Sequence, residues 1–329
     1  MSDVAHTAGV SLVTVSRAIN TPDKVSPETL QRVRQAIRHL GYVPNLTAGS
    51  LASSRSNIVA AIVPTLSNLV FSETVDALAA TLAHSGYQLL LGQSAYSADE
   101  EAALVDAFLG RRVDGLVLTG LSQSAALRAK LRRSGIPVVQ TWDFPSSPNQ
   151  NDPIDMLVGF SNIEVGRAAA RHLLSRGHAR LAFIGSDEER SRLRLSGFEA
   201  EAREQDAQAV EVSLIPPPVS VNDAGRILEG ILARNTGVSA VFCNNDLLAT
   251  GLLFTCLKNG WPVPDRMAVM GFGDLPLSRA TSPGLSTIRI HHTELGKRAG
   301  KLLLSRLSGK SIARPRQNIG FRIMQRSST

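Results

Sequence analysis

The sequence predicts an all-α helix-turn-helix domain at the N-terminus, followed by an α/β domain made of two lobes with doubly wound parallel sheets. Short amphipathic helical segments, two of them joined by a glycine turn, fill the first 44 residues. After residue 57, apolar runs alternate with amphipathic helices, and the alternation starts again after residue 160. We expect a helix-turn-helix domain at 1–44, a hinge helix and linker at 45–57, and the two-lobed domain at 58–329.

The composition fits a chain with a sizeable core and an anionic partner. Of its 329 residues, 43% are hydrophobic and 19% are charged, and the formal net charge is +7. Cys243 and Cys256 lie in apolar runs, which predicts core thiols rather than a disulfide framework or a metal site. Because neither a signal-like segment nor an apolar run of about 18 residues occurs, we expect a cytoplasmic protein with no membrane partner.

Each of the three N-terminal helical segments has a recognisable start or stop. Gly9 follows the first segment, where the chain reversal needs positive φ, and Ser11 can cap a second helix from about Leu12 to Asn20. Ser26 can cap the third helix, which Gly41 ends as a C′ residue. The inward faces are Val4, Ala5 and Ala8 in the first, Val15, Ala18 and Ile19 in the second, and Leu30, Val33, Ile37 and Leu40 in the third.

The outward face of the second helix suits the major groove of DNA. Arg17 can donate two hydrogen bonds to a guanine edge, and Leu12 and Val13 can contact thymine methyl groups. The hydroxyl side chains on this face suit phosphate oxygens. A three-helix module that binds protein is the alternative, but the outward apolar pair beside Arg17 favours DNA. The candidate DNA-contacting residues on this helix are Ser11, Leu12, Val13, Thr14, Ser16, Arg17 and Asn20.

Several stretches of the helical domain resemble the helix-turn-helix of LacI/GalR-type repressors. They are DVAHTAGVSLVTVSRAIN at 3–20, VSPET at 25–29 and LGYVPN at 40–45. The resemblance continues through nearly the whole chain. It implies a transcription regulator, acting as a repressor, whose homodimer reads two half-sites of double-stranded operator DNA.

Residues 45–52 form a weak helical pattern between the two domains. Asn45 can cap it, but Gly49 disfavours a helix, and so short a segment does not hold a helix alone in water. A plain linker is the alternative. The family resemblance implies instead that the segment orders on DNA beside its twin, with Leu51 wedged into the minor groove. Asn45 and Leu51 therefore join the candidate DNA-contacting residues.

The two-lobed domain resembles the periplasmic-binding-protein-like effector domain of the same family. Matching stretches include RVDGL at 112–116, GIPVV at 135–139 and FCNND at 242–246. The resemblance implies three chain crossings between the lobes and dimerisation through this domain. Lobe one then spans about 58–160 plus 291–320, and lobe two about 161–290 plus the C-terminal end. A small-molecule effector is expected in the cleft where the parallel strands end.

Loops after the predicted strands hold the candidate effector-binding residues. Aromatic side chains, including Trp142, can stack on a sugar face, and carboxylate and amide side chains can bond its hydroxyls. Arg190, Arg192 and Arg194 precede LSGF at 195–198, and the resemblance implies that arginines here clamp the ligand. The alternatives are a core role for Phe71 and Phe160, a helix cap for Asp246, and solvated arginines. The candidate set is Phe71, Asp143, Phe160, Asn162, Arg190, Arg192, Phe242, Asn245, Asp246 and Gly273.

One position favours an acidic effector. Many neutral-sugar regulators of the family carry an aspartate where this chain has Gly273, and Asp274 comes one residue later. Without that anion a carboxylate ligand escapes repulsion, and arginine binds carboxylates with a planar fork. Residues 64–71 and 157–162 look most like gluconate-utilisation repressors. The resemblance therefore implies gluconate or a related sugar acid as the effector, and genes of carbohydrate or sugar-acid catabolism as targets.

Other classes of protein fit the sequence less well. The motifs of dinucleotide sites, P-loops, nucleophile elbows and zinc proteases do not occur, so we expect no catalytic residue, metal or cofactor. The adjacent His291 and His292 face apart on a helix and lack the further ligands of a metal site. A periplasmic solute-binding protein shares the lobed fold, but it needs a signal peptide and would not carry residues 3–45.

Overall fold

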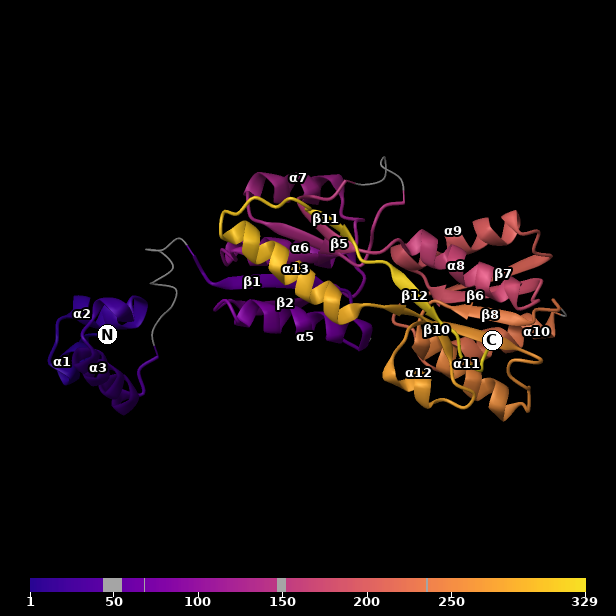
Figure 1. Cartoon of the computed structure of the whole chain (residues 1–329), viewed down its shortest axis with the longest axis horizontal. Helices are drawn as coiled ribbons and strands as arrows, with labels where there is room; N and C mark the ends of the chain where they lie inside the picture. Colours follow the sequence, from indigo (N-terminus) through magenta and orange to yellow (C-terminus); the bar gives the residue numbers. More distant parts are fainter. Residues whose placement is uncertain (44–54, 68, 147–151, 235) are drawn as a thin grey trace. The chain divides into compact units, whose positions relative to one another are not determined.

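The computed structural model in Figure 1 describes residues 1–43, 55–67, 69–146, 152–234 and 236–329. The chain divides into two compact units, Met1–Ser56 and Asn57–Thr329. Asn45 and Leu51, the candidate residues of the hinge segment, lie outside the described residues. The helix expected there is therefore neither supported nor contradicted by the fold.

The described part of the first unit is a small helical bundle. Its elements are α1 (Ser2–Ala8), α2 (Leu12–Asn20), the 3-10 turn η1 (Pro22–Lys24) and α3 (Pro27–Leu40). Ser11 and Ser26 accept the backbone N–H of Thr14 and Thr29, at 3.2 and 3.4 Å, so both predicted helix caps form. The buried core consists of Val4, Ala5, Ala8, Val15, Ala18, Val33 and Ala36.

The prediction that Leu40 faces inward is wrong, because this residue is 42% exposed. α3 ends at Leu40, and Gly41 takes a left-handed conformation with φ 59°. The chain then folds back, with the Tyr42 N–H bonded to the carbonyl oxygen of Ile37 at 3.0 Å. Tyr42 packs against the core, so its ring covers the end of the bundle in place of Leu40.

An arginine of α3 secures the turn between α1 and α2. Gly9 adopts φ 61°, the left-handed conformation that the chain reversal requires. Arg32 donates from Nη2 to the carbonyl oxygens of Ala8 and Gly9, at 2.5 and 3.1 Å. Because these carbonyls end α1, Arg32 fixes the end of α1 and the turn before α2 against α3.

The described residues of the second unit form two six-stranded sheets. The strands of the first sheet are β1 (Ile58–Val63), β2 (Gln88–Gln93), β3 (Gly115–Thr119), β4 (Val138–Thr141), β5 (Met156–Gly159) and β11 (Arg316–Asn318). Those of the second are β6 (Arg180–Ser186), β7 (Ala209–Ile215), β8 (Ala240–Cys243), β9 (Ala268–Gly273), β10 (Ser286–Ile290) and β12 (Phe321–Met324). The strand orders are β11-β5-β4-β3-β1-β2 and β12-β10-β9-β8-β6-β7, and β12 runs antiparallel to β10.

Helices pack on both faces of each sheet. The helices are α5 (Leu69–Ala83), α6 (Ala98–Gly110), α7 (Ala125–Ser134), α8 (Asn162–Ser175), α9 (Glu189–Glu204), α10 (Asp223–Ala233), α11 (Asp246–Lys258), α12 (Pro276–Ala280) and α13 (His292–Leu307). Along β1, Ala60 and Ile62 join a core with α6 and α7, whereas Val59 and Ala61 join another with α5 and α13. This alternation is the doubly wound arrangement, and it confirms the predicted fold class.

Each sheet with its helices forms one lobe, and the chain passes between the lobes at three places within the described residues. These crossings lie between β5 and α8, between β10 and α13, and between β11 and β12. As a result α13 returns to pack on α5 of the first lobe, as Figure 1 shows, while β12 pairs with β10 of the second. None of the helices described in the chain is both long and apolar enough to cross a membrane.

Candidate functional site

The beginning of α2 presents a surface of mixed chemistry. Leu12 and Val13 are 50% and 58% exposed, and Arg17 is exposed one turn further along. Ser11 caps the helix, and its hydroxyl oxygen lies 2.9 Å from that of Thr14. Apolar, hydroxyl and guanidinium groups therefore share one helix end, which fits the base edges and phosphates of a major groove.

Two other predicted DNA-contacting residues, Ser16 and Asn20, lie further along α2. Ser16 is half-buried on α2, and Asn20 is the last residue of that helix. Asn45 and Leu51 fall outside the described residues. The surface at the beginning of α2 is thus formed by Ser11, Leu12, Val13, Thr14 and Arg17.

A second candidate site is a pocket between the two lobes, which we call the interlobe pocket. The first lobe supplies Thr65, Ser67, Val70, Phe71, Tyr96 and Trp142. The second lobe supplies Ser186, Glu188, Arg190, Arg194, Pro218, Val219, Asn244, Asn245, Leu247 and Phe272. Because both lobes form its walls, a ligand here contacts both and can bias their arrangement.

Two buried arginines of α9 face one carboxylate in this pocket. Arg190 Nη2 lies 3.0 Å from Glu188 Oε2, and Arg194 Nη2 lies 3.3 Å from Glu188 Oε1. None of the three side chains is more than 10% exposed. Burial lowers the pKa of Arg194 to about 10 while Glu188 opposes the shift, so Arg194 stays charged at neutral pH.

Asn162 and Asp143 orient Arg194 without lining the interlobe pocket. Arg194 Nη1 donates to Asn162 Oδ1 at 2.6 Å, and Asn162 Nδ2 donates to Asp143 Oδ1 at 3.0 Å. Close packing of α8 on α9 permits this chain of bonds, since a Cβ on Gly166 would lie 1.8 Å from the carbonyl oxygen of Arg194. Burial raises the pKa of Asp143, and the bond from Asn162 opposes that shift.

Aromatic rings flank the two arginines. The ring centroids of Phe71 and Trp142 lie 4.8 Å apart, and Arg190 Cζ lies 5.8 Å from the Phe71 centroid. Arg194 Cζ lies 4.5 Å from the centroid of Phe272. These cation–π contacts favour the buried charges, and the ring faces suit the C–H groups of a sugar chain.

Two lining residues adopt backbone conformations that are rare for residues with a side chain. The φ angle is 62° at Tyr96 and 66° at Trp142. Such a conformation costs about 1–3 kcal/mol and persists where the surrounding structure enforces it, often at ligand sites. The backbone therefore marks the same pocket as the arginines do.

Unpartnered polar atoms also gather around the interlobe pocket. Within the described ranges, the buried side-chain atoms without a hydrogen-bond partner are Ser186 Oγ, Arg194 Nε and His292 Nε2. Ser186 and Arg194 line the pocket, and His292 stacks on Trp142 with ring centroids 5.4 Å apart. Because buried polar groups are normally bonded, this clustering indicates a site that a polar ligand completes.

The candidate site is not a metal centre in the part of the chain that is described. Those residues contain no group of three or more His, Cys, Asp or Glu side chains able to hold a metal ion.

His292, which stacks on Trp142, pairs with a carboxylate. Its Nδ1 lies 3.3 Å from Glu73 Oε2. Burial lowers the pKa of His292 although Glu73 opposes the shift, so the imidazole is neutral at neutral pH.

Phe160 and Phe242, both predicted to contact the effector, belong to the core instead. Phe160 is fully buried, with its ring 5.9 Å from Trp142 and 6.1 Å from Phe272. Phe242 is fully buried in β8 and packs 5.6 Å from Phe183. Both lie within or directly after a strand, so their rings fill the layer between sheet and helices, and the polar residues of the next loop line the pocket.

Arg192 also lies away from the interlobe pocket. Its side chain is 60% exposed and its Nη2 lies 2.7 Å from Asp187 Oδ1. Arg190 and Arg194 are four residues apart and share one face of α9, which leaves Arg192 on another face. Arg194, rather than Arg192, therefore accompanies Arg190 in the pocket.

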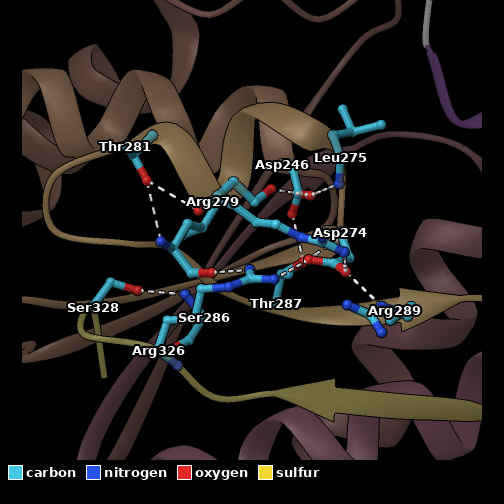
Figure 2. A network of polar contacts seen from close by, with 12 residues as sticks. Asp246, Asp274, Leu275, Arg279, Thr281, Ser286, Thr287, Arg289, Arg326 and Ser328 are labelled. Atoms are coloured by element: carbon cyan, nitrogen blue, oxygen red, sulfur yellow. Dashed lines mark hydrogen bonds and ion pairs between the residues drawn. The ribbon is translucent and has the colours of Figure 1, made fainter.

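The three remaining predicted residues have different places. Asn245 lines the pocket and caps α11, accepting the Leu248 N–H at 2.8 Å. Asp246 is buried behind the lining, where its carboxylate accepts bonds that fix the loop after β9 (Figure 2). The bonds to Asp246 come from Leu275 N at 2.8 Å, Ser278 Oγ at 2.6 Å and Thr287 Oγ1 at 2.6 Å.

Gly273 lies where the two lobes approach each other. It has φ 130°, and a Cβ there would lie 3.0 Å from Val70 Cγ1 of the other lobe.

Asp274 is surrounded by arginines and does not line the interlobe pocket. Figure 2 shows its carboxylate beside Arg279, Arg289 and Arg326. Its side chain is 1% exposed, and Oδ2 lies 2.6 Å from Arg289 Nε. Burial raises the pKa of Asp274, but hydrogen bonds from Arg326 and Arg289 outweigh this and bring the pKa below its usual value. The loop after β9 thus adds no free anion to the pocket.

Sequence reasoning missed some of the lining residues. Glu188 carried a signal, since a carboxylate at a helix start that precedes arginines in the first turns can cap the helix and pair with them. Tyr96 and Asn244 carried none. Tyr96 reaches the pocket through its left-handed backbone, and Asn244 through the turn that ends β8.

Known families match both units of the chain. Residues 1–45 match the family described as bacterial regulatory proteins, lacI family, and residues 170–329 match the periplasmic binding protein-like domain. The HTH-type transcriptional regulator GntR of Pseudomonas aeruginosa is 40% identical over 331 residues, covering 100% of this chain and 95% of that protein.

Solved structures of bacterial regulators show the same similarity. A LacI family transcriptional regulator from Silicibacter pomeroyi superposes with a TM-score of 0.92 at 30% identity, covering 99% of this chain and 98% of that one. The transcription regulator GntR from Chromobacterium violaceum gives a TM-score of 0.77 at 36% identity, covering 82% of this chain and 98% of that one. The similarity therefore extends over both units.

Proposed function

Because the chain belongs to the LacI family of bacterial transcriptional regulators, we propose that it represses genes of carbohydrate or sugar-acid catabolism under the control of a sugar acid such as gluconate. Membership confirms the resemblance drawn from the sequence. The relatives are named as transcriptional regulators, so the chain is a DNA-binding regulator and not an enzyme.

One observation carries the choice of effector. Arg190 and Arg194 are buried in the interlobe pocket beside aromatic walls, and Arg194 Nε and Ser186 Oγ have no partner among the described residues. Arginine binds a carboxylate through a planar fork, and the hydroxyl and amide groups of the lining suit a polyhydroxylated chain. Relatives named GntR give further support.

The DNA contact assigned to α2 rests on its exposed end. In this proposal Arg17 reads a base edge, Leu12 and Val13 contact thymine methyl groups, and the hydroxyls of Ser11 and Thr14 contact phosphates. Because phosphate contacts supply much of the affinity, operator binding should weaken steeply as salt rises.

The hinge belongs to the same proposal. Residues 45–57 join the DNA-binding unit to the two lobes, with Asn45 capping a helix that forms on the operator and Leu51 entering the minor groove. An effector that biases the two lobes can then act on DNA through this segment. We propose that binding of the effector makes the protein release the operator.

A homodimer working in the cytoplasm completes the proposal. Phe254 and Leu257 of α11 are 56% and 73% exposed, and Leu277 of α12 is 47% exposed. A group of large exposed apolar side chains suits an interface with another protein chain. A second copy seated on α11 would cover them and bring two DNA-binding units to one palindromic site.

Calorimetry and DNA binding test the proposal together. Purified full-length protein is titrated with gluconate, related sugar acids, neutral hexoses and purines. The same ligands are then added to complexes with the chain's own promoter fragments, followed by fluorescence anisotropy. We expect sugar acids to bind and to lower operator affinity. Binding of neutral hexoses or purines, with no binding of sugar acids, would overturn the effector assignment and leave the regulator assignment intact.

A further inference from the structure

Among the described residues, the charged side chains that line the interlobe pocket are two cations and one anion. Arg190 and Arg194 are the cations, and Glu188 is the anion. Its other polar members are neutral hydroxyl and amide side chains. Within the lining itself one positive charge is therefore left over, and the carboxyl of Asp143 lies behind the lining, linked to Arg194 through Asn162.

Glu188 is fixed in place and cannot turn away from the arginines. Oε2 accepts the backbone N–H of Arg190 at 3.1 Å and lies 3.0 Å from Arg190 Nη2. Oε1 accepts the backbone N–H of Ser191 at 2.8 Å and lies 3.3 Å from Arg194 Nη2. Both oxygens thus combine a helix-cap bond with an arginine contact, and the side chain is 9% exposed.

Arg194 has a hydrogen-bond donor that no protein group accepts. Its Nε has no partner within the described residues, although the residue is buried and only 4% exposed. Ser186 Oγ, in the same lining, has no partner among them either. A buried donor without a partner is costly, and the lining holds one cation more than it holds anions, so a ligand that supplies one negative charge and accepts these bonds completes the site.

We propose that Glu188 sets the charge of the accepted effector, so that the interlobe pocket selects a polyhydroxy acid with a single negative charge. One carboxylate neutralises the lining. A neutral sugar leaves the positive charge unpaired, and a dicarboxylate or phosphorylated acid brings a second negative charge against Glu188. This inference rests on the proposed function and deepens it by naming the charge class of the ligand.

Three ligands with the same six-carbon skeleton test this by calorimetry on the full-length protein, and in glucarate a second carboxylate replaces the terminal hydroxyl group of gluconate. Gluconamide, gluconate and glucarate carry no, one and two negative charges at neutral pH. The native protein should bind gluconate at least about tenfold more tightly than either of the others. Equal affinity for gluconate and glucarate would overturn the inference.

Charge-changing variants then assign the effect to Glu188. Glu188→Gln keeps a cap acceptor and removes the charge, so glucarate should gain on gluconate by about tenfold or more. Arg190→Gln changes the charge in the opposite direction and should favour gluconamide over gluconate. The double variant restores the original charge and should restore the preference for gluconate, a result that loss of packing alone does not produce.

Glu189→Gln is the matched control, because it removes the same charge from the neighbouring exposed residue. Its ligand order should match the native protein. If gluconate binds but Glu188→Gln leaves the glucarate-to-gluconate ratio unchanged, this inference fails and the sugar-acid effector stands. If the native protein binds none of the acids, both fail.

Discussion

The beginning of α2 and the interlobe pocket both depend on arginine, yet they hold it in different states. Arg17 is exposed at a helix end, and the apolar side chains beside it are exposed as well. Arg190 and Arg194 are buried, and each pairs with Glu188 before any ligand arrives. Removing an exposed arginine should cost ligand binding alone, whereas removing a buried one should also cost stability, because buried acceptors then lose a donor.

The largest expected effect is that of Arg194→Met. It removes one of the two arginine contacts of Glu188 and the donor to Asn162 Oδ1, so the free energy of unfolding should fall by about 1.5–3 kcal/mol and sugar-acid binding should be lost. Urea denaturation and calorimetry measure the two effects. Arg192→Met, two residues away and exposed, should change stability by about 0.5 kcal/mol or less. Similar losses in both variants would contradict the contrast between buried and exposed arginines.

Arg17→Ala should have the next largest effect, confined to DNA. Losing the contact to a base edge should weaken specific operator binding by about 1–3 kcal/mol, with effector affinity and thermal stability unchanged. Anisotropy with a promoter fragment and with bulk DNA measures the specificity. A matching loss of effector binding would show that the two regions do not act independently.

Gly9→Ala should destabilise the DNA-binding unit through its backbone. Gly9 has φ 61°, and a Cβ there would lie 2.9 Å from Arg32 Nη2, so a cost of about 1–2 kcal/mol is expected. Gly41→Ala is the control, because φ is 59° and nothing lies within 4 Å of its Cβ. Thermal unfolding should show a larger loss of stability for Gly9→Ala than for Gly41→Ala. Equal losses would show that crowding against Arg32 adds no cost at Gly9.

The smallest effect concerns acid pH and Asp274. Its pKa in the folded chain lies below the usual value, so the ionised carboxylate adds stability above about pH 4. That contribution is lost as the pH falls through the folded pKa. Asp274→Asn should therefore show a shallower loss of stability than the native protein between about pH 5 and about pH 2. Parallel acid unfolding curves would contradict this.

The comparison also explains which features the sequence could predict. The helix caps at Ser11 and Ser26, the turn at Gly9 and the exposed face of α2 depend on residues a few positions apart, and local spacing predicts them. The alternation of strands and helices likewise predicted the doubly wound fold. In the pocket, by contrast, Phe71, Arg190 and Asn245 are the residues of the candidate set that reach the lining, and Trp142 and Arg194, named beside that set, reach it as well.

The other pocket predictions depended on information that spacing does not contain. Phe160 and Phe242 were judged by residue type, but the side to which a strand turns its ring depends on packing against helices from other parts of the chain. Asp143 and Asn162 were predicted to contact the effector, but they lie behind the lining of the pocket. There Asn162 bonds both Asp143 and Arg194. Glu188 was missed although its position at a helix start before two arginines could have indicated it.

The three crossings between the lobes limit how the regulator can respond. A single linker would let one lobe move in any direction relative to the other, whereas three crossings of the chain leave few independent motions, mainly a hinge rotation. Whatever binds between the lobes therefore selects a position along one coordinate. Substitutions within the crossings should change the strength of communication with DNA more than the affinity of either site.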